Sequence, residues 1–169
     1  MSATNETSVD QASLRALQDR IEITDVLYKY CSAIDSFDKQ GVRSVLADDI
    51  EARYGNLDPV SGGDALAEWI AGATSTIVWQ HHMLSVYHVN VDGDAATALS
   101  YLASYQVFEQ DERVAKTLAA RYHDELRRTP DGWKISRRTG EFLWGETRTV
   151  DEEWLSILGG RGPEVWPKR

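Results

Sequence analysis

The sequence is poor in cysteine, because its 169 residues include a single one, Cys31. One cysteine cannot form an intramolecular disulfide, which excludes a disulfide-stabilised fold. Cys31 lies near Tyr28, Tyr30 and Ile34 in a helical pattern. We therefore expect it to be a small buried hydrophobic residue and not a reactive thiol.

Positive charge is also scarce. The chain has 18 Lys and Arg residues against 27 Asp and Glu residues, giving a formal net charge of -9 and a pI near 4.9. Binding to nucleic acid requires a basic surface that neutralises phosphates, and this composition does not supply one. We therefore expect no nucleic acid partner.

Long apolar runs and cofactor motifs are missing as well. No apolar run approaches the roughly 20 residues needed to span a bilayer, and residues 1–12 lack the basic and apolar regions of a secretory signal. These features predict a cytoplasmic protein without a membrane partner. The sequence has no phosphate-binding glycine loop or dinucleotide fingerprint, and its four histidines lack the usual metal-ligand spacing. No cofactor and no metal is expected.

The length fits one domain with a single core, and no change in composition marks a second boundary. We expect a flexible tail over residues 1–12, a folded domain over 13–148 and an extension over 149–169. The extension is too apolar for a free tail. It contains Trp154, Leu155, Ile157, Leu158 and Trp166. It is expected to lie over a pocket or against a neighbouring subunit.

The N-terminal half has the pattern of helices. Over residues 13–34, apolar positions recur every three or four residues, which predicts one long amphipathic helix. Asp35 lies at its C-terminal end, where a carboxylate opposes the helix dipole. Further helices are predicted over residues 39–46 and 64–73, with a strand over 50–55 between them.

The second half has the pattern of strands. Segments rich in β-branched and aromatic residues cover 76–91, 95–109, 114–128 and 133–144, and turn signals separate them. Helices followed by long antiparallel strands predict an α+β domain in which a curved sheet wraps around the helices. An apolar pocket for a small ligand is expected between the long helix and the concave face of the sheet.

Asp35 and His82 are the most informative pair of residues in this arrangement. Asp35 ends an apolar helix, and His82 lies in an apolar strand-like run. Each side chain is costly to bury alone, so we expect the two to meet and satisfy one another. A buried Asp and His in contact form a general base. An alternative is that Asp35 caps the helix that follows.

Several segments resemble the SnoaL-like branch of the NTF2-like superfamily, whose members are cone-shaped α+β folds. The resemblance covers residues 14–145. It rests on the first helix ending at Tyr30 to Asp35, the run His81-His82-Met83-Leu84-Ser85, the turn Asp92-Gly93-Asp94, and the segments Arg121 to Leu126 and Asp131 to Ile135. The order and spacing of these segments together indicate the fold.

Within the superfamily, the pattern is similar to scytalone dehydratase, hexachlorocyclohexane dehydrochlorinase and bile acid 7α-dehydratase, whose members use an Asp–His dyad. The resemblance implies that Asp35 and His82 form the dyad. It also implies catalytic roles for Tyr30, Tyr54 and Arg138. It further implies a homo-oligomer, most often a trimer or dimer packed through its sheets.

The neighbouring residues leave alternatives open. His81 and His82 are adjacent on a strand and point to opposite faces, so only one lines the pocket, and the resemblance favours His82. His88 shares the face of His82 if the strand has no bulge. The repeat Arg137-Arg138 leaves open which arginine faces the pocket.

The aromatic residues have two interpretations. Tyr30 and Tyr54 are either core aromatics or hydrogen-bond donors to a substrate. The expected walls of the substrate pocket are Trp79, Leu84, His88 and Phe142.

These features predict a cofactor-independent lyase of the dehydratase type that acts on a small apolar cyclic or aromatic substrate. In this hypothesis His82, oriented by Asp35, removes a proton, and Tyr30, Tyr54 or Arg138 stabilises the developing charge. The same residues would serve an isomerase, the opening of an epoxide or the loss of formaldehyde from an aromatic diol. A non-catalytic ligand-binding module of the same fold is a further alternative.

Overall fold

The computed structural model describes residues 10–149 of the chain. Helix α1 covers Gln11–Asp35, and the side chain of Asp10 caps it by accepting a hydrogen bond from the backbone N–H of Ser13 at 2.8 Å. Such a cap satisfies one of the free N–H groups of the first turn. The helix therefore begins slightly before the predicted position. The expected cover by residues 150–169 lies outside the described residues.

A compact group of short elements follows α1. It consists of α2 (Lys39–Ser44), β1 (Leu46–Tyr54), β2 (Val60–Ser61) and α3 (Gly63–Ala73). Leu46 was predicted to end a helix but begins β1 instead. The reason is long-range pairing, because Leu46 lies opposite Ile135 in the sheet, and such pairing overrides a short helical pattern.

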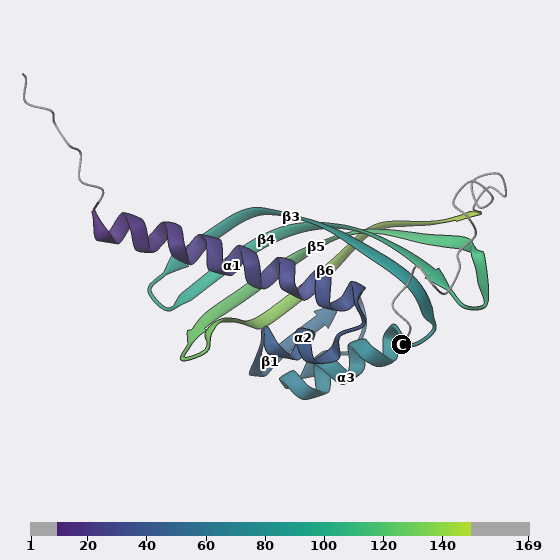
Figure 1. Ribbon diagram of the computed structural model, residues 1–169, viewed down its shortest axis with the longest axis horizontal. Helices are drawn as coiled ribbons and strands as arrows, with labels where there is room; N and C mark the ends of the chain where they lie inside the picture. The colour runs from purple at the N-terminus through teal and green to yellow at the C-terminus, as the bar shows by residue number, and fades with distance from the viewer. Residues whose placement is uncertain (1–9, 150–169) are drawn as a thin grey trace, which may run out of the picture.

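Four long strands form most of the sheet: β3 (Ile77–Asp92), β4 (Ala95–Phe108), β5 (Asp111–Thr129) and β6 (Gly132–Thr149). The strand order is β2-β1-β6-β5-β4-β3, with β1 parallel to β6 and the other neighbours antiparallel. The long strands curve along α1, while α2, α3 and β1 gather beneath the C-terminal end of α1 (Figure 1). This arrangement confirms the predicted α+β fold with a curved sheet around the helices.

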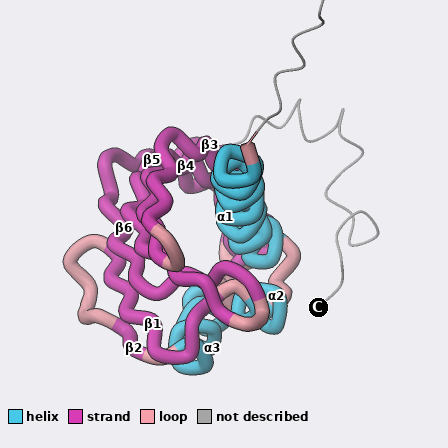
Figure 2. The backbone as a smooth tube through the Cα atoms, turned by 90° about the vertical axis from the view of Figure 1, so that its left-hand side faces the viewer, coloured by secondary structure: helices cyan, strands magenta, loops and turns pink. Residues whose placement is uncertain are grey.

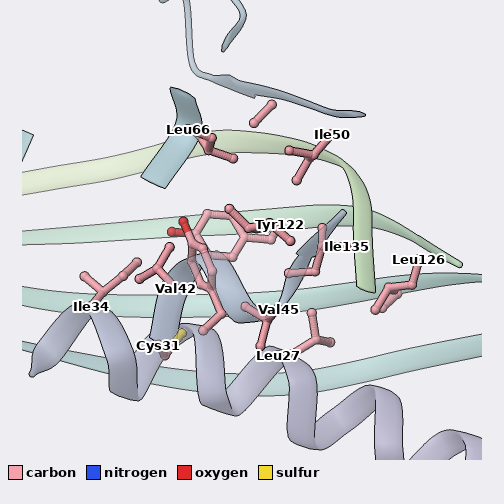
Figure 3. Close-up of a cluster of buried hydrophobic side chains, with 14 of the residues drawn as sticks. Leu27, Cys31, Ile34, Val42, Val45, Ile50, Leu66, Tyr122, Leu126 and Ile135 are labelled. Carbon is pink, nitrogen blue, oxygen red and sulfur yellow. The ribbon is translucent and has the colours of Figure 1, made fainter. Parts of the chain in front are cut away.

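Helix α1 lies beside β3, which is an edge strand of the sheet (Figure 2). The face of the sheet that packs against α1 and the core is called here the inner face, and the opposite one the outer face. Ile23, Leu27 and Cys31 of α1 are buried against this inner face. Figure 3 shows Leu27 and Cys31 reaching toward Tyr122 and Ile135 of the sheet.

Cys31 is buried in this core, as predicted, and its burial raises the pKa of the thiol to about 12. The thiol is therefore protonated at neutral pH. Its role in the structure is that of a small hydrophobic side chain.

Candidate active site

Asp35 and His82 lie in contact where the end of α1 meets the edge strand β3. Asp35 Oδ1 lies 2.5 Å from His82 Nδ1, and Asp35 Oδ2 accepts a hydrogen bond from the backbone N–H of His82 at 2.9 Å. The His82 side chain is 7% exposed and that of Asp35 is 21% exposed. Both carboxylate oxygens of Asp35 therefore contact His82, and this two-point contact fixes the orientation of the imidazole ring.

This contact determines what the imidazole can do. An ionised carboxylate only accepts hydrogen bonds, so the Nδ1 atom of His82 is the donor. The Nε2 atom is then left to accept a proton. The alternative role of Asp35 as a helix cap is wrong, because Asp38 caps α2 by accepting a hydrogen bond from Gly41 N at 2.8 Å.

His81 and Trp79 lie on the other side of β3. The His81 side chain is 53% exposed, and its Nδ1 lies 3.8 Å from Asp35 Oδ2. The Trp79 and His81 rings stack with centroids 6.3 Å apart. Strand alternation therefore places Trp79, which was expected to line the pocket, on the side of His81 and not on that of His82.

His88 also lies away from His82. The pairing of β3 with β4 shifts between Val86 and His88 because of a bulge. One extra residue reverses the alternation, so Val89 is buried and His88 is exposed. The condition for His88 to share the face of His82, a strand without a bulge, is therefore not met, and His88 lies on the outer face.

A second group of polar side chains, called here the Tyr–Arg cluster, consists of Tyr30, Tyr54, Tyr122, Asp124 and Arg138. The hydroxyls of Tyr30 and Tyr54 are 2.7 Å apart. The Arg138 guanidinium lies 4.0 Å from the Tyr30 ring centroid and 4.2 Å from that of Tyr122. Helix α1 thus carries members of both groups, with Tyr30 about 7.5 Å along the axis before Asp35.

Arg138 is held by Asp124 on the neighbouring strand. Arg138 Nε donates to Asp124 Oδ1 at 2.6 Å and Nη2 donates to Oδ2 at 2.8 Å. Their side chains are 1% and 0% exposed. Burial alone would lower the pKa of Arg138, but the Asp124 carboxylate overcomes this and holds that pKa well above its ordinary value. Arg138 is therefore a fixed, fully charged group.

Tyr30 and Tyr54 of this cluster carry neutral hydroxyls. Burial raises the pKa of Tyr30 well above its ordinary value, and the neighbouring Tyr54 raises it further. Burial also raises the pKa of Tyr54, although the charge of Arg138 opposes the effect. Both phenols keep their protons at neutral pH, and because one hydroxyl donates to the other, one proton of the pair remains to donate to a further group.

The choice between Arg137 and Arg138 is settled by a second bulge. The pairing of β5 with β6 shifts between Glu125 and Leu126. Alternation from Ile135 alone would place Arg137 on the inner face, but the extra residue places Arg138 there. Arg137 is exposed, and its Nη2 atom lies 3.2 Å from Oε2 of Glu51.

The remaining expected pocket residues lie in different surroundings. Leu84 is half-buried, packs against the core and pairs with Leu102. Phe142 is 45% exposed, and its ring covers the turn at Gly55, where an added Cβ atom would come within 2.8 Å of it. Leu84 therefore lies on the inner face with His82, whereas Phe142 lies half-exposed beside the turn at Gly55.

The sequence analysis did not assign a role to Asp124 or Gln80. Gln80 is buried on the inner face, and its Nε2 donates to the carbonyl oxygen of Ile34 in the last turn of α1 at 2.6 Å. A signal was present for both, because each is a polar residue at an inward position of an alternating strand. Gln80 precedes His82 by two residues, and Asp124 lies between the inward-facing Tyr122 and Leu126.

A hollow of about 470 Å³ opens next to the end of α1. Helices α1, α2 and α3 each supply part of its lining, including Ile34, Val42 and Ile70. Asp35 is not among the lining residues, so this hollow lies beside the Asp35–His82 contact without including it.

Within residues 10–149, no three His, Cys, Asp or Glu side chains are grouped so that they could hold a metal ion. Over the same range, no helix has both the length and the apolar character needed to cross a membrane.

An open, curved sheet wrapped around a long helix defines the class of NTF2-like α+β folds. The sequence pattern of the SnoaL-like domain matches residues 15–139, so the chain belongs to the SnoaL-like family.

Similar proteins are found by sequence and by structure. Uncharacterised proteins of Mycobacterium bovis and Mycobacterium tuberculosis are 32% identical over 127 residues, covering 75% of this chain and 86% of theirs. The structure of a proposed aromatic ring hydroxylase from Novosphingobium aromaticivorans is 28% identical with a TM-score of 0.71, covering 79% of this chain and 94% of that one.

Two other solved structures share the fold at lower identity. A proposed scytalone dehydratase from Novosphingobium aromaticivorans is 19% identical with a TM-score of 0.72, covering 80% of this chain and 91% of that one. A type 2 hexachlorocyclohexane dehydrochlorinase is 18% identical with a TM-score of 0.73, and the match covers 80% of this chain and 93% of that one. These two similarities establish the fold only.

Proposed function

We propose that this protein is a cofactor-independent lyase that eliminates water from a small cyclic or aromatic molecule, with His82 as general base. The observation that carries the proposal is the two-point contact of Asp35 with the ring and the backbone of His82. A base must have a fixed tautomer and a free nitrogen facing the substrate. The contact with Asp35 fixes the tautomer of His82 and leaves Nε2 as the free nitrogen.

In this mechanism, His82 Nε2 removes a proton from a carbon or hydroxyl of the substrate. The imidazole becomes positively charged, and the Asp35 carboxylate at 2.5 Å stabilises that charge. Return of the proton to the departing hydroxide releases water and restores the neutral imidazole. No external acid or base is consumed in the cycle.

The Tyr–Arg cluster supplies the complementary electrophilic groups. Tyr30 and Tyr54 are protonated, and Arg138 is charged and held by Asp124. Donors fixed before the reaction stabilise developing negative charge without reorganising. We assign them to the substrate oxygen that gains charge as the proton leaves.

Two features of the surroundings support elimination over the alternatives. Asp35 is bound to His82, whereas an isomerase using a lone carboxylate base would leave the carboxylate without a histidine partner. Two of the similar structures are a proposed dehydratase and a dehydrochlorinase, whose names both describe eliminations.

The test is a turnover screen of hydroxylated aromatic and alicyclic compounds with the wild-type protein and His82→Ala. The expected result is dehydration of at least one compound, with a rate about 10²–10⁴ lower in the variant. His81→Ala is the matched control, because His81 is the adjacent imidazole on the opposite side of β3, and it should retain most of the rate. Equal turnover by wild type and His82→Ala would reject His82 as the base.

A further inference from the structure

The last turn of α1 is tied to strand β3 by the side chain of Gln80. Its Nε2 donates to the carbonyl oxygen of Ile34 at 2.6 Å, and the residue is only 4% exposed. Ile34 directly precedes Asp35, and Gln80 lies two residues before His82 on the same face of β3. The Gln80–Ile34 bond and the Asp35–His82 contact are therefore neighbouring links between the same two elements.

A further side-chain bond links α1 to β3 far from this end. Arg20 Nη1 donates to the carbonyl oxygen of Val89 at 2.9 Å. Fifteen residues of helix, about 22 Å, separate Arg20 from Asp35, so this bond cannot hold Asp35 in place. Near Asp35, the Gln80 amide supplies a hydrogen bond between α1 and β3 that does not depend on Asp35 or His82 themselves.

The end of α1 is also fixed along the chain. The backbone N–H of Phe37 donates to Ile34 O at 2.9 Å. That of Asp38 donates to Ala33 O at 2.8 Å. These are the two bonds of a Schellman motif, and Phe37 takes its left-handed position with a φ of 55°, where glycine is usual. The carbonyl of Ile34 therefore accepts from the turn that ends the helix and from Gln80, which fixes that end against β3.

The contact between Asp35 and His82 requires this placement. Asp35 is a short side chain, and its two oxygens reach the ring and the backbone of the same residue. Both contacts form only if the backbone of Asp35 is held at the correct height along β3. Catalytic groups need placement within about 0.5 Å, and an error of about 1 Å can cost about 10²-fold in rate.

Folding alone does not explain a glutamine at position 80. Gln80 Oε1 is buried without a hydrogen-bond partner among residues 10–149. A buried acceptor without a partner costs stability, and an apolar side chain of similar size would fill the position without that cost. Gln80 therefore contributes through its NH2 group, whose acceptor is Ile34.

We propose that Gln80 is a positioning residue for the His82 base, and this inference rests on the proposed function. Gln80 is enclosed between α1 and β3 and does not touch the substrate. Its amide holds the last turn of α1 so that the Asp35 carboxylate meets both the ring and the backbone N–H of His82. Without the amide, the tautomer of His82 is no longer fixed.

The experiment compares Gln80→Met and Gln80→Leu with the control Arg20→Met. Both Gln80 variants keep an apolar side chain of similar volume, and Arg20→Met removes a bond of the same kind at the far end of α1. The first measurement is the 15N NMR signals of the His82 ring in the full chain, identified by their absence in His82→Gln. These signals report which ring nitrogen carries the proton.

The wild type and Arg20→Met should show one tautomer, with the proton on Nδ1. The Gln80 variants should show a mixture of the two tautomers. In the turnover assay, kcat of the Gln80 variants should fall about ten- to a hundredfold with KM changed less than twofold. Arg20→Met should keep kcat within about twofold even where its melting temperature falls as far as that of Gln80→Met.

An unchanged tautomer in the Gln80 variants would overturn the inference, as would an equal change in Arg20→Met, which would indicate general loosening of α1. The NMR result does not depend on turnover, so the two proposals fail separately. Loss of the single tautomer in a protein without turnover would support the positioning role and reject the lyase. Turnover that depends on His82 but not on Gln80 would support the lyase and reject the positioning role.

Discussion

Arg138 on β6 and Asp124 on β5 form two parallel hydrogen bonds, 2.6 Å and 2.8 Å long, inside the core. Removing one member of such a buried pair leaves the other charge without compensation. Asp124→Ala should therefore lower the free energy of unfolding by about 3–5 kcal/mol, measured by urea denaturation. Glu125→Ala, at the adjacent exposed position, should change it by less than about 0.5 kcal/mol.

Replacing both members of the pair has a different expected result. The double variant Asp124→Leu with Arg138→Met leaves no buried charge, so it should recover most of the lost unfolding free energy. It should not recover turnover, since the Arg138 donor is gone. Full activity in this stable double variant would show that Arg138 takes no part in the reaction.

Asp35→Asn should separate the orientation of His82 from the folding of the chain. An asparagine can still accept a hydrogen bond from the backbone N–H of His82, but its NH2 group would donate to Nδ1, which moves the ring proton to Nε2 and removes the base. We expect a decrease in kcat of about 10²–10⁴, with a melting temperature within a few degrees of wild type. Asp38→Asn, which alters the nearby helix cap, should leave kcat unchanged; an equal loss of kcat there would point to a general effect on this region.

The pair formed by Asp19 and Arg128 should contribute to stability in a pH-dependent way. Burial alone would raise the pKa of Asp19, but the hydrogen bond from Arg128 at 2.7 Å outweighs it, so that pKa lies below the ordinary 3.8. A lowered pKa in the folded state means that the stabilisation is present above about pH 4 and lost as the pH falls through the folded value. Asp19→Asn should cost about 1–2 kcal/mol at pH 7.

The measurement is the free energy of unfolding of wild type and Asp19→Asn between about pH 3 and pH 8. The difference between them should be constant in the neutral range and should shrink toward the acid end. A difference that is independent of pH throughout this range would contradict the assignment to the Asp19 carboxylate.

Ser100→Ala and Ser104→Ala should not destabilise the protein. Both hydroxyls are fully buried and have no hydrogen-bond partner among residues 10–149, so replacing them removes a desolvated polar group without breaking a hydrogen bond within that range. We expect melting temperatures equal to or above that of the wild type. A drop of more than about 4 °C, equivalent to roughly 1 kcal/mol, would indicate that the hydroxyl has a structural partner.

Much of the fold could be predicted from the sequence, because periodicity reports directly on which side of an element is buried. The apolar spacing before Ile34 predicted α1, and the turn at Gly93 predicted the hairpin between β3 and β4. The short strand β2 (Val60–Ser61) was missed, because two residues carry no measurable alternation. Its pairing with β1 depends on contacts that form only in the folded chain.

The site was predictable only as far as alternation holds. The family resemblance favoured His82 over His81, and alternation from His82 would have placed His88 on the same face, but the bulge after Val86 turns His88 outward. A bulge of the same kind selects Arg138 over Arg137 on β6. A single extra residue leaves no clear trace in composition, so the sequence alone could not locate either bulge.

The position of His82 on an edge strand has a consequence for solubility. Edge strands expose free backbone N–H groups that can recruit a strand from another molecule and start aggregation. Asp35 occupies one of these groups, at His82, with a charged side chain that a foreign strand would have to displace. The Asp35 carboxylate that orients the imidazole thus also hinders another molecule from pairing with the edge strand β3.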